Sequence, residues 1–304
     1  MYFLRRLVLL LPLLLLISFL AFVLVRVAPG GPFDRERKPA SPEIERQLQA
    51  KYHLDEPLWK QYARFLKDLS QGDFGVSLQY RNHTVNDIIR QALPVSAILG
   101  MLVFGFTMGL GLPLGWLTAV RRGRWEDYAG SLFAVLMICI PGFVVAPLLV
   151  MWLGIKWRLL PVALWASPAH AVLPVIALGL YFAGRVARLM REGMLGVMSS
   201  EFITAARAKG LSENALLLRH ALPLAILPVV SYSGPLLADL LTGSFVIETI
   251  FQIPGLGAFF VNGSLNRDYT LVVGLVMLYA ALLVVLNLLV DLIYVLLDPR
   301  VKYD

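Results

Sequence analysis

The sequence predicts an all-α integral membrane protein with six transmembrane helices, an extracytoplasmic helical cap after the first span, and a cytoplasmic pair of short helices. Of the 304 residues, 58% are hydrophobic and only 15% are charged, whereas soluble domains are about 45–50% apolar. The apolar residues fall in long blocks, and about 20 helical residues are needed to cross a bilayer. Basic residues lie in short segments between those blocks, so the net charge of +7 indicates topology and not nucleic-acid binding.

Six blocks are long enough to cross a membrane. The predicted spans cover residues 7–28, 96–120, 129–153, 169–188, 224–247 and 271–297. The first block follows Arg5 and Arg6 as a signal peptide would, but its apolar run from Leu7 to Val25 exceeds the usual core of about 7–15 residues. No Ala-x-Ala-like cleavage site follows it, so we expect this block to remain as a membrane helix.

The distribution of lysine and arginine predicts the orientation. Short loops that are rich in lysine and arginine lie mostly in the cytoplasm. One side of the predicted bundle carries Arg5, Arg6, Arg121, Arg122, Arg124, the basic residues from Arg185 to Arg219, Arg300 and Lys302. The short loops of the other side carry only Lys156, Arg158 and Arg267. With six spans, both termini are therefore expected in the cytoplasm.

The segment after the first span is expected to be an ordered cap outside the membrane. Ser41, Pro42 and Glu43 supply a capping residue, a proline and an acid, which together predict a helix start. Pro57 opens a second amphipathic helix, which Gly72 is expected to close. The spacing leaves two roles open: a surface for an external partner, or a lid packed on the bundle. The chain is thus divided into residues 1–28, the N-terminus and first span; 29–94, the cap; and 95–304, a five-helix core containing segment 199–223.

Segment 199–223 predicts two short helices that meet at a sharp corner. Either Ser199 or Ser200 is placed to cap the first helix, and Glu201 lies in its first turn, where negative charge is favourable. Gly210 suits the left-handed position just beyond that helix. Ser212 is placed to cap the second helix.

The first of these helices is expected to present a surface of small residues. Ala205, Ala206 and Ala208 would let another protein approach closely, and Pro223 begins the next membrane span. The segment therefore predicts a compact knob on the cytoplasmic side, which moves together with the spans that flank it.

The same segment resembles a known motif. Thr204-Ala205-Ala206, three residues, Gly210, nine residues and His220-Ala221-Leu222-Pro223 resemble the EAA motif of binding-protein-dependent ABC importer permeases. That motif is Glu-Ala-Ala, three residues, Gly, nine residues and Ile-x-Leu-Pro. Thr204 stands where the family has Glu, and His220 replaces Ile, so the contacts of the knob's rim with its partner stay open.

Further segments in the same order resemble the first, B-type permease subunit of oligopeptide and dipeptide importers. They are Arg26-Val-Ala-Pro29-Gly30, Gly72-Asp73-Phe74-Gly75, the stretches Gly243–Glu248, Ile253–Gly257 and Asn266–Tyr269, and Asp298-Pro299-Arg300. The resemblance implies a multi-pass protein of the bacterial cytoplasmic membrane that imports oligopeptides. Dipeptides, glutathione, murein peptides and nickel chelates stay open as alternative cargo.

The resemblance also implies partners. These are a second homologous permease, two cytoplasmic ATP-binding subunits, an extracytoplasmic peptide-binding protein and the membrane lipid. The chain has no GxxxxGK[ST] phosphate loop, so ATP and Mg²⁺ are expected on the ATP-binding subunits, and this chain is expected to be no enzyme and to hold no cofactor. The residues implied in coupling to the ATPases are Glu201, Thr204, Ala205, Ala206, Arg207, Lys209, Gly210, Leu222 and Pro223.

Polar residues inside the spans are candidates for the transport pathway, since ionisable groups are costly in lipid. Asp239 lies in the fifth predicted span, after Ser231 and Tyr232. The Asp239 carboxylate is either an acceptor for the amino group of a peptide or a hydrogen-bonded contact between packed helices. The four histidines have no ligand-like spacing, so no metal site is expected.

Two other classes of protein fit the sequence less well. A self-contained membrane enzyme would need clustered catalytic side chains near one membrane surface, and none is evident. A secondary transporter is expected to show inverted repeats and ion-coordinating broken helices, and no repeat is detectable in the sequence.

Overall fold

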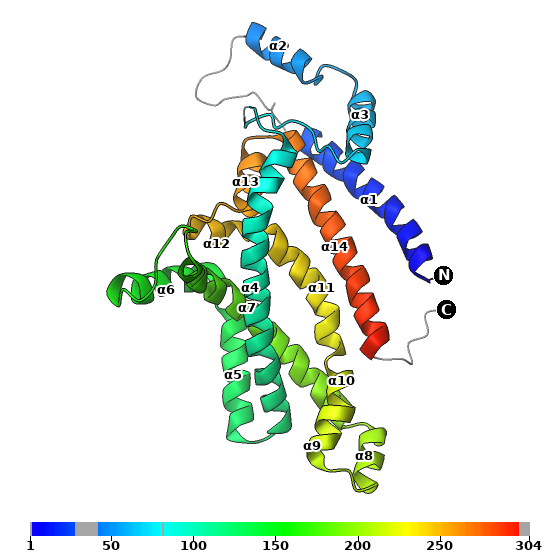
Figure 1. Ribbon diagram of the computed structural model, residues 1–304, viewed down its shortest axis with the longest axis vertical. Coiled ribbons are helices and arrows are strands. Elements are labelled where there is room, and N and C mark those ends of the chain that lie inside the picture. Colours follow the sequence, from blue (N-terminus) through cyan, green and yellow to red (C-terminus); the bar gives the residue numbers. More distant parts are fainter. Residues whose placement is uncertain (1, 28–41, 81, 298–304) are drawn as a thin grey trace. The chain divides into compact units, whose positions relative to one another are not determined.

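The computed structural model describes residues 2–27, 42–80 and 82–297, and these are mostly helical (Figure 1). Among them, five helices are long and apolar enough to cross a membrane, or six if one bent pair counts as a single span. The predicted all-helical class with several apolar spans is thereby confirmed. The chain forms two compact units, residues 1–94 with 255–282, and residues 95–254 with 283–304.

The first unit contains the helices that lead into and out of the expected cap. They are α1 (Tyr2–Val27), α2 (Pro42–Lys51), α3 (Leu58–Ser70), the start of α4 (Val85–Val120), α13 (Leu256–Leu265) and the first part of α14 (Tyr269–Leu297). Val85, Ile88 and Ala92 of α4 form a buried core with Leu256 and Leu271. Residues far apart in sequence thus share one core.

Helix α3 packs on α1 through aromatic side chains. The ring of Tyr62 lies 5.6 Å from that of Phe19 and 5.2 Å from that of Phe22. Its hydroxyl lies 2.8 Å from the hydroxyl of Ser18. These contacts hold the aromatic face of the amphipathic helix α3 against α1.

The cap helices follow the sequence prediction closely. Helix α2 begins at Pro42 and α3 directly follows Pro57, whereas the expected cap Ser41 lies outside the described residues. Gly72 has a φ of +76° beyond the end of α3, which is the left-handed conformation that a helix-closing glycine adopts.

The second span begins earlier than predicted. Helix α4 starts at Val85 and not near residue 96, because Thr84 and Asp87 cap it reciprocally. The Asp87 carboxylate accepts hydrogen bonds from the Thr84 backbone N–H at 3.0 Å and its hydroxyl at 2.6 Å. The Asp87 N–H in turn donates to the Thr84 hydroxyl at 3.1 Å. This Thr-x-x-Asp pattern is a capping-box arrangement. It lies before residue 96, where the hydropathy of the sequence placed the start of the second span.

The second unit contains the remaining helices. They are the rest of α4 and α14, α5 (Trp125–Cys139), α6 (Gly142–Leu149), the π-helix η1 (Val150–Lys156), α7 (Pro168–Met198), α8 (Glu201–Ala208), α9 (Glu213–Ala215), the π-helix η2 (Leu216–Ala221), α10 (Leu222–Ala225), α11 (Leu227–Thr242) and α12 (Phe245–Ile250). Helices α5 and α7 are joined through Ala134, Met137, Ala183 and Ala187.

The third predicted span, 129–153, is bent in the structure. Helix α5 ends at Cys139, and the helical segment from Gly142 to Lys156 continues at an angle of 96° to it. Pro141 explains the break, because the residue before a proline is pushed out of the helical conformation. Ile140 accordingly has an extended backbone with φ −95° and ψ 112°. The pair is a broken span or a re-entrant segment.

Two further boundaries differ from the prediction. Helix α7 does not end near residue 188 but continues to Met198, directly before segment 199–223. The fifth predicted span, 224–247, corresponds to the candidate span Leu227–Ile250, within which α11 ends at Thr242. Gly243 there has a φ of +94°, so the helix restarts only at Phe245 as α12.

Candidate functional site

Segment 199–223 forms the predicted helical corner at one end of the second unit, where Figure 1 shows α8 and α9 beside α10. Helix α8 ends at Ala208, and Gly210 turns the chain with a φ of +83°. The Ser212 hydroxyl accepts a hydrogen bond from the Ala215 N–H at 3.4 Å. The left-handed glycine and the serine cap of the second arm are therefore as predicted.

The cap of the first arm differs from the prediction. Ser200 occupies the capping position of α8, but its side chain makes no capping bond. Its hydroxyl donates instead to the carbonyl of Val197, and the Ser199 hydroxyl donates to the carbonyl of Gly196. Both serines thus tie the corner back to the end of α7.

The knob is anchored through its own hydrophobic core. Ile203 of α8 is fully buried, together with Leu216 of η2 and Met194 of α7. Ala206 is also buried, at 8% exposure, so the expectation that it belongs to a presented small-residue surface was wrong. Ala206 faces inward because it lies three residues after Ile203, on the same side of the helix.

Helix α7 approaches α10 so closely that only a glycine fits at the contact. A Cβ atom on Gly193 would lie 2.2 Å from the carbonyl oxygen of Ala225. Ala225 is itself fully buried in the same core as Ile203. The corner is therefore in direct contact with α7 and with the helical segment that leads into α11.

An ion pair braces the corner on its exposed side. The Arg207 guanidinium donates to the Glu213 carboxylate, with Nε–Oε1 at 2.6 Å and Nη2–Oε2 at 3.2 Å. This hydrogen-bonded pairing lowers the pKa of Glu213 below its usual range and raises that of Arg207. Arg207 was predicted as a coupling residue, but its bond across Gly210 to the second arm is visible only in the structure.

The outward surface of the knob mixes small, charged and apolar side chains. Thr204, Ala205, Lys209 and Gly210 are exposed, as is Glu201. Large apolar side chains are exposed beside them: Phe202, Leu211 and Leu218 are 44%, 37% and 56% exposed. These three residues were not predicted as part of the surface, because none of them is a position of the motif. Exposed large apolar groups of this kind are a feature of surfaces that bind protein partners.

The last residues of the motif lie in an unusual helical stretch. Residues 216–221 form a π-helix that runs directly into α10, which contains Leu222 and Pro223. Both are partly buried, and Leu222 packs against the core of the knob. The Nδ1 atom of His220 is buried and has no hydrogen-bond partner in the described chain.

A second polar contact joins α5 to α7 near the knob. The Arg191 guanidinium donates to the Asp127 carboxylate through Nε at 3.0 Å and Nη2 at 3.1 Å. Asp127 is 5% exposed and also accepts hydrogen bonds from the Gly123 N–H and the Ser131 hydroxyl. This clasp was not predicted, because the two residues are 64 positions apart.

The three predicted pathway residues on α11 do not lie on one face. Ser231 and Asp239 are exposed on the same side as Pro228 and Pro235. Tyr232 is half-buried against the core, and the Arg185 guanidinium lies 5.7 Å from its ring centroid. In the described part of the chain, the Asp239 carboxylate has no hydrogen bond or ion pair.

Comparison with known proteins relates the chain to one group of transport proteins. A profile of the family "binding-protein-dependent transport system inner membrane component" matches residues 111–303. The oligopeptide transport system permease protein OppB of Haemophilus influenzae is 44% identical, covering 98% of both chains. The dipeptide transport system permease protein DppB of Bacillus subtilis is 43% identical, covering 95% of this chain and 94% of its own.

A solved structure shares the fold at low sequence identity. The MetNI methionine ABC transporter in an inward-facing conformation contains a chain with a TM-score of 0.55 and 19% identity. The match covers 69% of this chain and 96% of that one.

Proposed function

Because the chain belongs to the family of binding-protein-dependent transport system inner membrane components, we propose that it is the permease subunit of an ATP-driven importer and that its cargo is peptides. Relatives named for oligopeptide and dipeptide transport are 44% and 43% identical over nearly the whole chain. Oligopeptides are the cargo we favour, and dipeptides are the alternative within the same class. The knob faces the cytoplasm in this proposal, with both termini on the same side.

The braced corner at Gly210 supports the coupling role. Its exposed surface would dock on an ATP-binding subunit, which carries ATP and Mg²⁺. A force applied to α8 would pass through Ile203 and Ala206 into the core shared with α7 and η2. Tight packing transmits such a displacement because it leaves little free volume to absorb it. The two arms and their flanking helices would therefore move as one body.

The assembly proposed here contains a second homologous permease, two ATP-binding subunits and an extracytoplasmic peptide-binding protein. It is tested by purifying the tagged chain from its native membrane and identifying the proteins and the peptides that remain bound. ATP-dependent uptake of a labelled tripeptide by vesicles containing the purified assembly is the expected activity. Uptake that continues without ATP, or by this chain alone, would exclude the proposed function.

The exposed polar face of α11 is the proposed lining of the pathway. Asp239 is an uncompensated carboxylate on a membrane helix, and such groups usually face a water-filled cavity or a partner. We place Asp239 where the amino group of a passing peptide can donate to it, with Ser231 two helical turns away on the same face. Tyr232 supports this helix from its packed side.

Replacement of Asp239 by asparagine tests that role. D239N should reduce uptake of peptides with a free amino group by about tenfold, because a hydrogen bond between charged groups is lost. Uptake of N-acetylated peptides should stay at the parental rate. An equal reduction for both kinds of peptide would show that Asp239 acts through packing and not through cargo recognition.

A further inference from the structure

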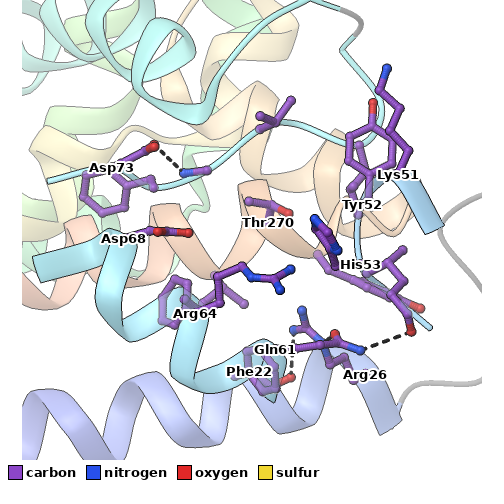
Figure 2. A pocket seen from close by; sticks show the side chains of 18 residues that line it. Phe22, Arg26, Lys51, Tyr52, His53, Gln61, Arg64, Asp68, Asp73 and Thr270 are labelled. Atoms are coloured by element: carbon purple, nitrogen blue, oxygen red, sulfur yellow. Dashed lines mark hydrogen bonds between the residues drawn. The ribbon is translucent and has the colours of Figure 1, made fainter. Parts of the chain in front are cut away.

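A cavity of about 280 Å³ lies in the first unit, among α1, α3, the residues after α2 and the start of α14. Figure 2 shows Arg26 and His53 on one side of it and Asp68 and Asp73 on the other, with Arg64 between them. The cavity thus carries positive and negative side chains on different walls.

Arg26 and Asp68 are opposite charges in this cavity that have no ion pair among the described residues, as are Lys51 and Asp73, although the Asp73 carboxylate accepts a hydrogen bond from the Gly75 N–H. Arg26 donates to the side chain of Gln61 at 3.1 Å and lies 3.5 Å from the ring centroid of Phe22. It has no carboxylate partner among the described residues, and the Asp68 carboxylate there has neither a hydrogen bond nor an ion pair. Arg64, in contrast, is neutralised by Glu56 at 2.9 Å. A ligand with both an anionic and a cationic group would complement Arg26 and Asp68 together.

The location of the cavity indicates the source of such a ligand. Arg26 lies one residue before the end of α1, whose most apolar stretch is only 11% buried within the protein. A basic residue at the end of a poorly covered span lies at the level of the lipid headgroups. A headgroup that carries a phosphate and an ammonium is the zwitterion available at that depth.

A second, apolar cavity of about 400 Å³ follows the same helices toward the middle of the span. Three helices line it: α1 through Leu11, Leu14 and Leu15, α3 through Leu66, Leu69 and Ser70, and α14 through Met277 and Ala281. Phe74 lines both cavities. Leu14 precedes Arg26 by twelve residues, which corresponds to about 18 Å of helix. That distance is close to one leaflet of a bilayer whose hydrocarbon core is about 30 Å thick.

We infer that these two cavities bind one phosphatidylethanolamine molecule, with its phosphate at Arg26, its ammonium at Asp68 and an acyl chain in the apolar cavity. The ammonium of this lipid has three N–H donors, whereas the trimethylammonium of phosphatidylcholine has none. Phosphatidylglycerol carries the phosphate but no cation. The site therefore selects the headgroup by hydrogen bonding as well as by charge.

Native mass spectrometry of the purified full-length protein tests this inference. The protein is stripped of lipid and titrated separately with phosphatidylethanolamine, phosphatidylcholine and phosphatidylglycerol that share the same acyl chains. Phosphatidylethanolamine should bind about tenfold more tightly than either of the others. Equal affinity for the three lipids would overturn the assignment.

Variants separate the two contacts. R26Q should weaken phosphatidylethanolamine binding about tenfold, and D68N should abolish the preference for phosphatidylethanolamine over phosphatidylcholine. R122Q removes an exposed arginine outside both cavities and should change neither. Parental lipid binding by R26Q, or a retained preference in D68N, contradicts the inference.

A soluble competitor distinguishes a bound lipid from a bound soluble molecule with the same headgroup. Glycerophosphoethanolamine has the same headgroup without acyl chains, and it should not displace the lipid at equal concentration. Displacement at equal concentration would show that the first cavity binds a soluble zwitterion and would overturn the lipid assignment. The readout is lipid retention, so it is independent of peptide uptake.

Discussion

Replacement of Gly210 by valine should slow peptide import by about five- to thirty-fold without lowering the amount of protein in the membrane. Gly210 has a φ of +83°, and a residue with a side chain adopts that conformation at a cost of about 1–2 kcal/mol. This free energy corresponds to a factor of about 5–30 in the equilibrium ratio of native to displaced corner. The space around Gly210 is open, with no atom within 4 Å of an added Cβ, so the whole effect arises from the backbone.

The surroundings of Gly210 concentrate the strain at the corner. Ile203 and Leu216 anchor the two arms in one core, so the arms do not adjust easily. The Arg207–Glu213 ion pair is exposed, and such pairs contribute little stability in water. The strain should therefore displace the docking surface while leaving the spans inserted.

Uptake of a labelled tripeptide by cells provides the assay, with the permease quantified in the membrane fraction. G210N is the first control, because asparagine tolerates the left-handed conformation better than other residues with a side chain. G196V is the second, because Gly196 lies in α7 with open space around it and without a positive φ. Parental import by G210V, or a defect in G210N as large as that in G210V, would refute the reasoning.

Three further predictions concern the same region. D127N and R191Q should each lower the free energy of unfolding by roughly 1–3 kcal/mol, because each removes a charged hydrogen-bond partner; thermal unfolding in detergent should show a less-than-additive loss in the double variant. The Arg207 hydrogen bond lowers the pKa of Glu213 below 4.5, so its stabilisation of the corner is present above that pH and is lost as the pH falls through the lower, folded pKa. Because the pair is exposed, the protection of the corner amides relative to their intrinsic exchange rate should fall only modestly in that acid range in the parent, and by the same modest amount already at neutral pH in E213Q. G193A should force α7 away from Ala225 and lower the unfolding temperature, and an unchanged temperature would contradict the close contact.

Several features of the corner followed from the sequence because they depend on neighbouring residues. A glycine just after a short helix and a serine before the next one satisfy backbone requirements that act over a few positions. The apolar blocks likewise predicted where most spans run, since burial in lipid needs only length and composition. The family resemblance rested on the same local patterns, and the comparisons confirmed it.

Some errors of prediction also have local causes. The bend at Pro141 was not predicted, because an average hydropathy over an apolar block does not register a proline that breaks the helical backbone. The early start of α4 was missed because the Thr84–Asp87 cap lies in a polar stretch that hydropathy assigns to the cap segment.

The amino-acid sequence by itself determined the class of protein, the approximate spans and the corner at Gly210, since each arises from interactions between near neighbours. Only the tertiary structure decided that Ala206 faces the core, that Arg191 clasps Asp127, and that Arg26 and Asp68 line one cavity. Those contacts join helices that are distant along the chain. Their formation depends on how whole helices pack, which no local pattern of residues specifies.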